Sequence, residues 1–257
     1  MNTLRRIPVP IALLFLFDLV LVAVPAIDFL IGSPWGRLRN FVDLDAESSL
    51  PTWYASMQWF CAAGLFGMLA VHAWRQRLRG GLYIGILGLA FLAFSIDEVV
   101  QLHEWLGEES DALLPDATRG ATAFSSTGIW PFVVGIPVLA ILVFIVLRMR
   151  HIFVPHAPHA LRLLIAGIII MFTGALIVEL AANLVEVRRS GIGLLQVTAE
   201  EFLEMLGVSF IVWSGYEGLR AHGIELRLPA ARRATIVDAP VAGPEAGPAT
   251  LPQSARG

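Results

Sequence analysis

Polar side chains interrupt the apolar sequence at three places, and their types could support acid–base or metal chemistry. The segment FSIDEVVQLHEWL, residues 94–106, combines acids, an amide and His103. At about 100° per residue, positions three, four and seven apart share one face of a helix. Each place therefore predicts a helix with a polar stripe of carboxylates and an amide. The three stripes are Asp97, Gln101 and Glu104; Glu179, Asn183 and Glu186; and Gln196, Glu200 and Glu204.

The composition predicts that these stripes lie in membrane-spanning helices. The chain is 56% apolar and only 15% charged, whereas soluble domains average about 25% charged residues. Apolar blocks of roughly 20 residues are long enough to cross a hydrocarbon core. The expected fold is an all-α integral membrane bundle of six transmembrane helices. The six blocks are Pro8–Ile31, Thr52–Trp74, Gly81–Trp105, Thr127–Leu147, Leu161–Val187 and Leu195–Leu219.

The distribution of arginine predicts the orientation of the bundle. The chain has 18 arginines and no lysine. If the amino-terminus lies inside, the loops after the first, third and fifth blocks lie outside. Those outer loops carry only five of the arginines: Arg37, Arg39, Arg119, Arg188 and Arg189. Arginine-rich loops stay cytoplasmic, so both termini are expected in the cytoplasm of a bacterium, with the bundle in its inner membrane. Residues 1–228 would form the bundle. Residues 229–257, rich in Pro, Ala and Gly, would form a disordered cytoplasmic tail.

With this orientation, the three stripes fall in the outer half of the membrane. A charge facing lipid at the centre of a bilayer costs about 2.5–3.5 kcal/mol, so the stripes should turn toward one another. Several carboxylates brought together must share protons, meet arginines or bind a cation. The inner half is nearly apolar apart from Asp18, which favours a site on one side over a pathway through the membrane.

A cation bound at this level would be held by oxygen ligands. Carboxylates and amides favour Mg²⁺, Mn²⁺ or Ca²⁺, one histidine would admit iron, and zinc is less favoured. The expected ligands are Asp97, His103, Glu104, Glu179, Glu200 and Glu204. The expected rim of the site is Gln101, Asn183, Glu186, Asp43, Asp45 and Glu47.

The last three rim residues lie in the loop FVDLDAESSLPTW, residues 41–53. Acids at alternating positions can offer oxygens to a hard cation, although a solvated acidic loop is the simpler interpretation. Pro51 should begin the next helix, with Ser49 as its cap.

The sequence also excludes several kinds of cofactor. Without lysine there is no Schiff base for retinal, and Cys61 alone cannot form an intrachain disulfide. Neither a nucleotide-binding glycine loop nor a pair of histidines placed for haem is present, and no nucleic-acid partner is expected. The segment HIFVPHAPH, residues 151–159, could bind metal, or it could be a polar linker.

The blocks LDAESSLPTWYAS, IDEVVQLHE and EEFLEMLG resemble blocks of a group of uncharacterised bacterial multipass membrane proteins. That resemblance implies no activity. The acidic first loop and the histidine-bearing acidic helix are distantly similar to membrane hydrolases of the alkaline ceramidase type. Those enzymes hold zinc with several histidines. In this sequence His103 is the only histidine expected at the same depth in the membrane as the three stripes.

Three functions remain open at this stage. The first is a divalent-metal-dependent membrane enzyme that acts on a lipid or small molecule at the outer leaflet. The second is a cation or proton transport protein whose acids bind or relay the ion. The third is a scaffold subunit of a membrane complex, whose acids pair with basic residues of another chain.

Overall fold

The computed structural model describes residues 7–32, 34, 36–44, 46, 48–114, 124–125, 127–183 and 192–224, and these residues form helices joined by turns and short loops. Two of its helical segments, η4 and η5, are π-helical, and η1 is a 3₁₀ turn. In chain order the elements are α1 (Val9–Leu30), α2 (Gly36–Phe41), α3 (Leu50–Arg75), α4 (Gly81–Val100), α5 (Leu102–Ser110), η1 (Asp111–Leu113), η4 (Pro131–Gly135), α6 (Ile136–His156), α7 (Pro158–Phe172), η5 (Thr173–Val178), α8 (Glu179–Ala181) and α9 (Ile192–Ala221).

Five of these helical stretches in the described residues are long and apolar enough to cross a membrane. They are Val9–Leu30, Leu50–Arg75, Gly81–Val100, Pro131–His156 and Pro158–Ala181. The chain is therefore a multipass membrane protein in character. The sixth expected span corresponds to α9, which has 30 residues but carries several acids. Six spans and the orientation of the termini stay predictions.

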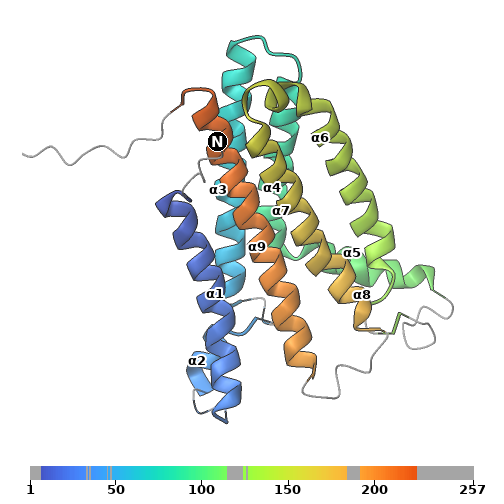
Figure 1. Ribbon diagram of the computed structural model, residues 1–257. Helices are drawn as coiled ribbons and strands as arrows, with labels where there is room; N and C mark the ends of the chain where they lie inside the picture. The colour runs from blue at the N-terminus through green and yellow to red at the C-terminus, as the bar shows by residue number, and fades with distance from the viewer. Residues whose placement is uncertain are drawn as a thin grey trace, which may run out of the picture. The chain divides into compact units, whose positions relative to one another are not determined.

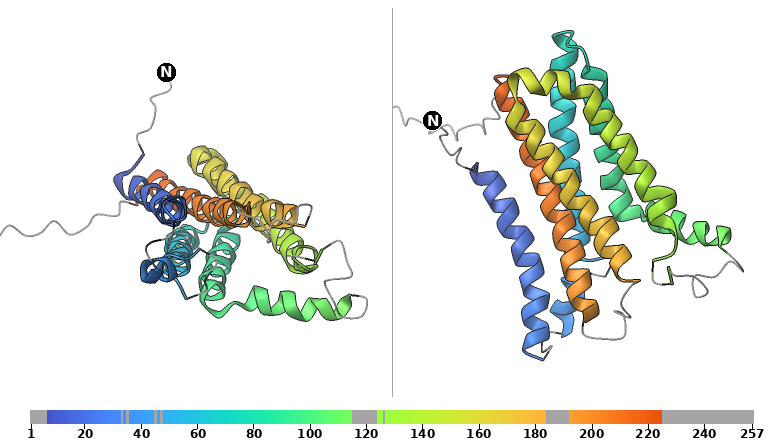
Figure 2. Two further views of the ribbon diagram at one scale, coloured as in Figure 1. Left: turned by 90° about the horizontal axis from the view of Figure 1, so that it is seen from below. Right: turned by 45° about the vertical axis from the view of Figure 1, so that its right-hand side comes forward.

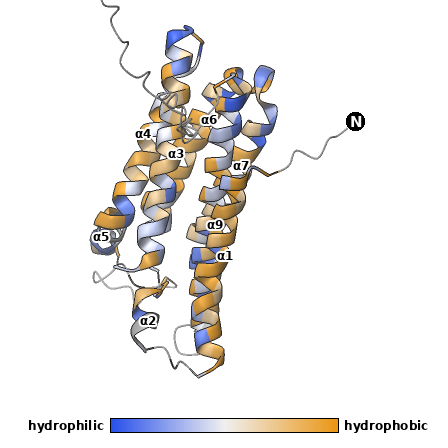
Figure 3. Cartoon of the chain, turned by 90° about the vertical axis from the view of Figure 1, so that its left-hand side faces the viewer, coloured by the Kyte–Doolittle hydropathy of each residue, from blue (hydrophilic) through white to orange (hydrophobic). Residues whose placement is uncertain are grey.

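The long helices run side by side, and their connections lie at two opposite ends (Figure 1). The start of α1, the α3–α4 turn, the α6–α7 junction and the end of α9 lie at one end, called here the amino-terminal end. The short helices α2, α5 and α8 lie at the other, called here the α5 end (Figures 1 and 2). Hydrophobic residues predominate along the helices between these ends (Figure 3).

The expected helix Gly81–Trp105 is broken, and the prediction of one continuous helix there is wrong. Gln101 has φ +63°, in the left-handed region, and its backbone N–H donates to the Asp97 carbonyl at 2.6 Å. A residue in this conformation ends a helix. The chain then turns sharply into α5, which runs away from the axis of α4 (Figure 2). Asp97, Gln101 and Glu104 therefore do not form one stripe on a continuous helix.

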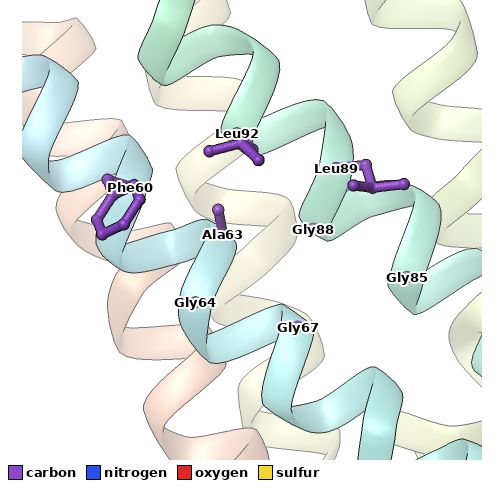
Figure 4. Close-up of a pocket in the computed structure, with 8 residues that line it drawn as sticks. All are labelled: Phe60, Ala63, Gly64, Gly67, Gly85, Gly88, Leu89 and Leu92. Carbon is purple, nitrogen blue, oxygen red and sulfur yellow. The ribbon is translucent and has the colours of Figure 1, made fainter.

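α3 packs closely on α4 through small and hydroxyl residues. Ser56 donates to the Ser95 carbonyl at 2.7 Å, and Ser95 donates to the Ser56 carbonyl at 2.9 Å. Such reciprocal bonds join helices where water is absent. A shallow apolar groove of about 240 Å³ follows this contact and is lined by Phe60, Ala63, Gly64, Gly67, Gly85, Gly88, Leu89 and Leu92 (Figure 4).

α9 is the central helix of the packing, since it contacts α1, α3, α7 and η5. Its closest approach is to α7, where a Cβ added at Gly207 would lie 2.5 Å from the Met171 backbone nitrogen. A Cβ added at Gly167 would lie 2.6 Å from the Gly207 carbonyl oxygen. Glycines facing each other in this way bring two backbones into contact. This contact fixes the position of α7, and hence of the segment after it, relative to α9.

Candidate functional site

Asp97 acts as a cap for α5. Its Oδ1 accepts a hydrogen bond from the His103 backbone N–H at 2.9 Å, and its Oδ2 lies 2.8 Å from His103 Nδ1. The first N–H groups of a helix lack partners within the helix. The Asp97 carboxylate supplies one across the break at Gln101, and it pairs with the imidazole of the same residue.

Both oxygens of Asp97 are thus engaged by His103. These interactions join Asp97 and His103 to each other across the helix break. The Glu104 side chain lies outside the described part of the chain. Asp97 and His103 therefore explain the fold of the segment IDEVVQLHE as a helix–break–helix unit.

Replacement of Asp97 by alanine is expected to loosen α5. Loss of a cap of this kind costs about 1 kcal/mol, and the effect should be local because α4 keeps its own packing. Hydrogen exchange followed by mass spectrometry should show faster exchange in peptides covering residues 102–110 and unchanged exchange in residues 81–95. The exposed Glu109→Ala provides the control. Equal protection of α5 in Asp97→Ala would show that the cap does not hold it.

The acidic cluster consists of five glutamates from three parts of the chain: Glu98 of α4, Glu179 of α8, and Glu200, Glu201 and Glu204 of α9. Glu204 interacts electrostatically with the other four. All five are half-buried. The prediction that acids of the three stripes form one ligand site stays a prediction. Glu98 and Glu201, which helical spacing places off the polar faces, belong to the cluster.

Two carboxyl groups of the acidic cluster, those of Glu179 and Glu200, are neighbours that interact electrostatically. Two neighbouring carboxylates repel each other, which favours a state in which one of them carries a proton. Gln196 Nε2 donates to Glu200 Oε2 at 2.8 Å, and Trp59 Nε1 donates to Glu98 Oε1 at 3.2 Å. The cluster therefore combines neighbouring carboxyl groups with two neutral donors at its edge.

The π-helical segment η5 positions Glu179. It follows α7 directly, spans Thr173–Val178 and ends immediately before Glu179. A π-helical turn changes the angular position of every residue after it, and such turns are frequent at functional sites. Gly174 lets η5 approach α9, since a Cβ there would lie 2.7 Å from the Glu200 carbonyl oxygen. This close approach brings Glu179 to Glu200.

The described rim residues other than Gln101 are Asn183 and Asp43. Asn183 bonds Thr127, with Nδ2 donating to Oγ1 at 2.8 Å and Oδ1 accepting from the backbone N–H at 3.3 Å. Asp43 lies in the loop before α3. Glu186, Asp45 and Glu47 lie outside the described residues. Ser49 caps α3 as expected, because its side chain accepts from the Thr52 backbone N–H.

A second polar site surrounds Asp18 of α1, which is fully buried. Its Oδ1 accepts from the Tyr54 hydroxyl at 2.7 Å and from Gln58 Nε2 at 2.9 Å, and its Oδ2 accepts from the Ser209 hydroxyl at 2.7 Å. The Asp18 network therefore joins α1, α3 and α9. Sequence reasoning missed it, although Tyr54 and Gln58 are one turn apart on one helix face.

Buried polar groups continue toward the amino-terminal end. Glu217 of α9 is 2% exposed and lies 3.7 Å from the Arg220 guanidinium. The imidazole rings of His72, His156 and His222 gather beyond it, at the ends of α3, α6 and α9. The expectation that this half of the bundle is apolar apart from Asp18 is therefore wrong. Glu217 is hidden from a hydropathy pattern because the residues before it in α9, 205–216, carry no charge and are mostly apolar.

One known protein family matches most of the chain. The family described as a domain of unknown function (DUF8692) matches residues 13–216. The chain belongs to this family. The match runs from α1 to α9, so it includes Asp18, the acidic cluster and the Asp97 cap. Neither a curated protein nor a solved structure matches the chain, and the likeness to alkaline ceramidase-type hydrolases gains no support from the family match.

Among the described residues, no three His, Cys, Asp or Glu side chains are already set around one metal position.

Proposed function

We propose that this multipass membrane protein transfers protons across the membrane, with the acidic cluster as the proton-binding site at the α5 end. The approach of Glu179 to Glu200, where η5 packs on the α9 backbone, carries the proposal, because two neighbouring carboxyl groups favour a proton held between them. Carboxylates in proximity titrate as a set, which lets the cluster take up or release a proton at modest cost.

Buried polar groups at successive levels support a pathway beyond the acidic cluster. From Glu204, α9 leads to Ser209 and its partner Asp18, and two turns later to Glu217. Ionisable residues inside a membrane protein are costly, and proton relays are built from them. The proposed route thus runs along α9 from the α5 end to the amino-terminal end.

A second candidate is a divalent-metal-dependent reaction at the α5 end. The observation that favours it is the oxygen-rich composition of the cluster, in which Glu179, Glu200 and Glu204 stand beside the Gln196 amide. Mg²⁺, Mn²⁺ and Ca²⁺ prefer such ligands, and a bound ion would activate water against a lipid or small molecule. In both proposals α9 is the sixth span, both termini are cytoplasmic, and the membrane is the bacterial inner membrane.

The test uses the purified full chain in lipid vesicles that contain a pH-sensitive dye. A potassium gradient with valinomycin sets the membrane potential, and the rate of change of internal pH is measured. The wild type should move protons faster than protein-free vesicles. Glu200→Gln and Asp18→Asn should remove most of that flux, whereas the exposed Glu109→Gln of α5 should keep it.

A wild type no faster than empty vesicles would exclude the proton proposal. The metal candidate is then tested by measuring the melting temperature of the protein in detergent. The protein is first treated with chelator, and Mg²⁺, Mn²⁺ or Ca²⁺ is then added. A ligand that binds only the folded state raises its stability. If the metal candidate is correct, adding the cation raises the melting temperature of the wild type and leaves that of Glu204→Gln unchanged. A wild type whose melting temperature does not change with any of the three cations would exclude the metal candidate.

A further inference from the structure

The apolar groove between α3 and α4 continues along α3 toward the amino-terminal end. A second hollow, of about 580 Å³, shares Gly64 and Gly67 with that groove, so the two form one continuous depression. The other residues that line the second hollow are Met68, Val71, His72, Arg75 and Ile224. We call the whole depression the α3 groove.

Glycine opens the middle of the α3 groove. A Cβ added at Gly64 or at Gly67 would have nothing within 4 Å, so the space beside these two residues is open. Gly85 and Gly88 of α4 lie on the other side of the hollow (Figure 4). Because a hydrocarbon core holds no water to fill such a space, an apolar chain is the kind of occupant that suits it.

The α3 groove has the length of one leaflet of a bilayer. Gly64 and Arg75 lie eleven residues apart on the continuous helix α3, which is about 16 Å at 1.5 Å per residue. Half of a hydrocarbon core of about 30 Å is about 15 Å. The distance from Arg75 to the glycines therefore matches the depth that an acyl chain reaches below its head group.

The end of the α3 groove is basic. Arg75 is exposed, it is the last residue of α3, and no carboxylate of the described residues pairs with it. Basic pockets between membrane helices bind the phosphate of anionic lipid head groups. The groove thus combines an apolar channel with a cationic end. Further arginines exposed at this end of the bundle are Arg77, Arg79, Arg148, Arg150 and Arg220.

The charge of Arg75 disfavours a second copy of this chain as the occupant. Two copies inserted in the same direction are related by an axis along the membrane normal, so equal residues meet at equal depth. Arg75 would then face Arg75 of the other copy, and like charges repel. An anionic lipid instead brings the opposite charge to the same position.

We propose that the α3 groove binds one anionic phospholipid from the leaflet at the amino-terminal end. An acyl chain lies along Gly64 and Gly67, and the phosphate lies on Arg75. In the proposed topology this leaflet is the cytoplasmic one. The site uses no residue of the acidic cluster or of the Asp18 network, so it does not depend on proton transfer.

The test is native mass spectrometry of the full chain, stripped of lipid in detergent. The protein is then mixed with phosphatidylglycerol, or with phosphatidylcholine that carries the same acyl chains. The wild type should bind one phosphatidylglycerol about fivefold more tightly than phosphatidylcholine, the factor that one basic residue contributes at an anionic surface. Arg75→Gln should remove this preference. Arg162→Gln, at an exposed arginine of α7 outside the groove, should keep it.

Leucine at Gly67 tests the apolar part of the α3 groove. Gly67→Leu fills the open space and should weaken the binding of both lipids by about tenfold, the effect of displacing two buried methylene groups. Cys61→Leu adds the same side chain at an exposed position of α3 outside the groove and should bind both lipids as the wild type does.

Three results would overturn the proposal of a lipid site. They are a wild type without preference for phosphatidylglycerol, an Arg75→Gln protein that keeps the preference, and a Gly67→Leu protein that binds lipid as the wild type does. The same spectra report the mass of the assembly. Wild-type dimers that Gly67→Leu dissociates would assign the groove to a second copy of the chain instead.

Discussion

Asp18→Ala is expected to lower the stability of the folded chain more than any substitution of an exposed acid. The carboxylate accepts hydrogen bonds from Tyr54, Gln58 and Ser209, which lie on two other helices. Hydrogen bonds between helices in a membrane bundle contribute about 0.6 kcal/mol each on average and up to about 1.7. Three lost bonds therefore predict a loss of about 2 kcal/mol or more, measured as a lower melting temperature in detergent.

Asp18→Asn distinguishes the hydrogen bonds from the charge. The amide oxygen can still accept from the Tyr54 hydroxyl, and the amide nitrogen can donate to the Ser209 hydroxyl, which can also accept. We therefore expect Asn to be much less destabilising than Ala. Glu108→Ala, in an exposed position of α5, is the control. An Ala variant that melts with the wild type would show that the Asp18 network does not hold α1 to α3 and α9.

The sequence predicts the long helices well but not where they end. Blocks of roughly 20 apolar residues mark the stretch of chain suited to the hydrocarbon core. Backbone hydrogen bonding can continue a helix beyond that stretch, and α6 extends past the expected end at Leu147 to His156. Apolar content also cannot reveal a break such as Gln101, which depends on a bond between the Asp97 carboxylate and the start of α5.

The candidate site as a set of metal ligands stays a prediction. Spacing at 100° per residue placed Glu179, Glu200 and Glu204 on the polar faces of their helices, and these three residues belong to the acidic cluster. It failed for Glu98 and Glu201, because a long side chain can reach a neighbour from an adjacent face. It also assumed a regular helix before Glu179, where the structure has the π-helical segment η5. The approach of the His72, His156 and His222 rings depends on contacts between helix ends far apart in sequence, which no local pattern reveals.

Gly207→Ala is expected to force α7 and α9 apart. The added Cβ would lie 2.5 Å from the Met171 backbone nitrogen and 2.7 Å from the Gly167 carbonyl oxygen. Because backbone atoms cannot rotate out of the way, the helices themselves must shift, at a cost of about 1–3 kcal/mol. Gly64→Ala is the matched control, since its Cβ would have nothing within 4 Å. Alanine is favoured over glycine in a helix by about 1 kcal/mol, so this control should melt at or above the wild-type temperature.

The same substitution should also act on the acidic cluster, although Gly207 carries no polar group. α7 continues through η5 to Glu179, so a shift of α7 away from α9 moves the Glu179 carboxyl group away from Glu200. Proton flux in vesicles should then fall in Gly207→Ala and persist in Gly64→Ala. A Gly207→Ala protein that melts lower but moves protons at the wild-type rate would show that the approach of these two carboxyl groups is not required for transfer. Loss of flux at a melting temperature well above that of the assay would tie the function to the distance between these two helices.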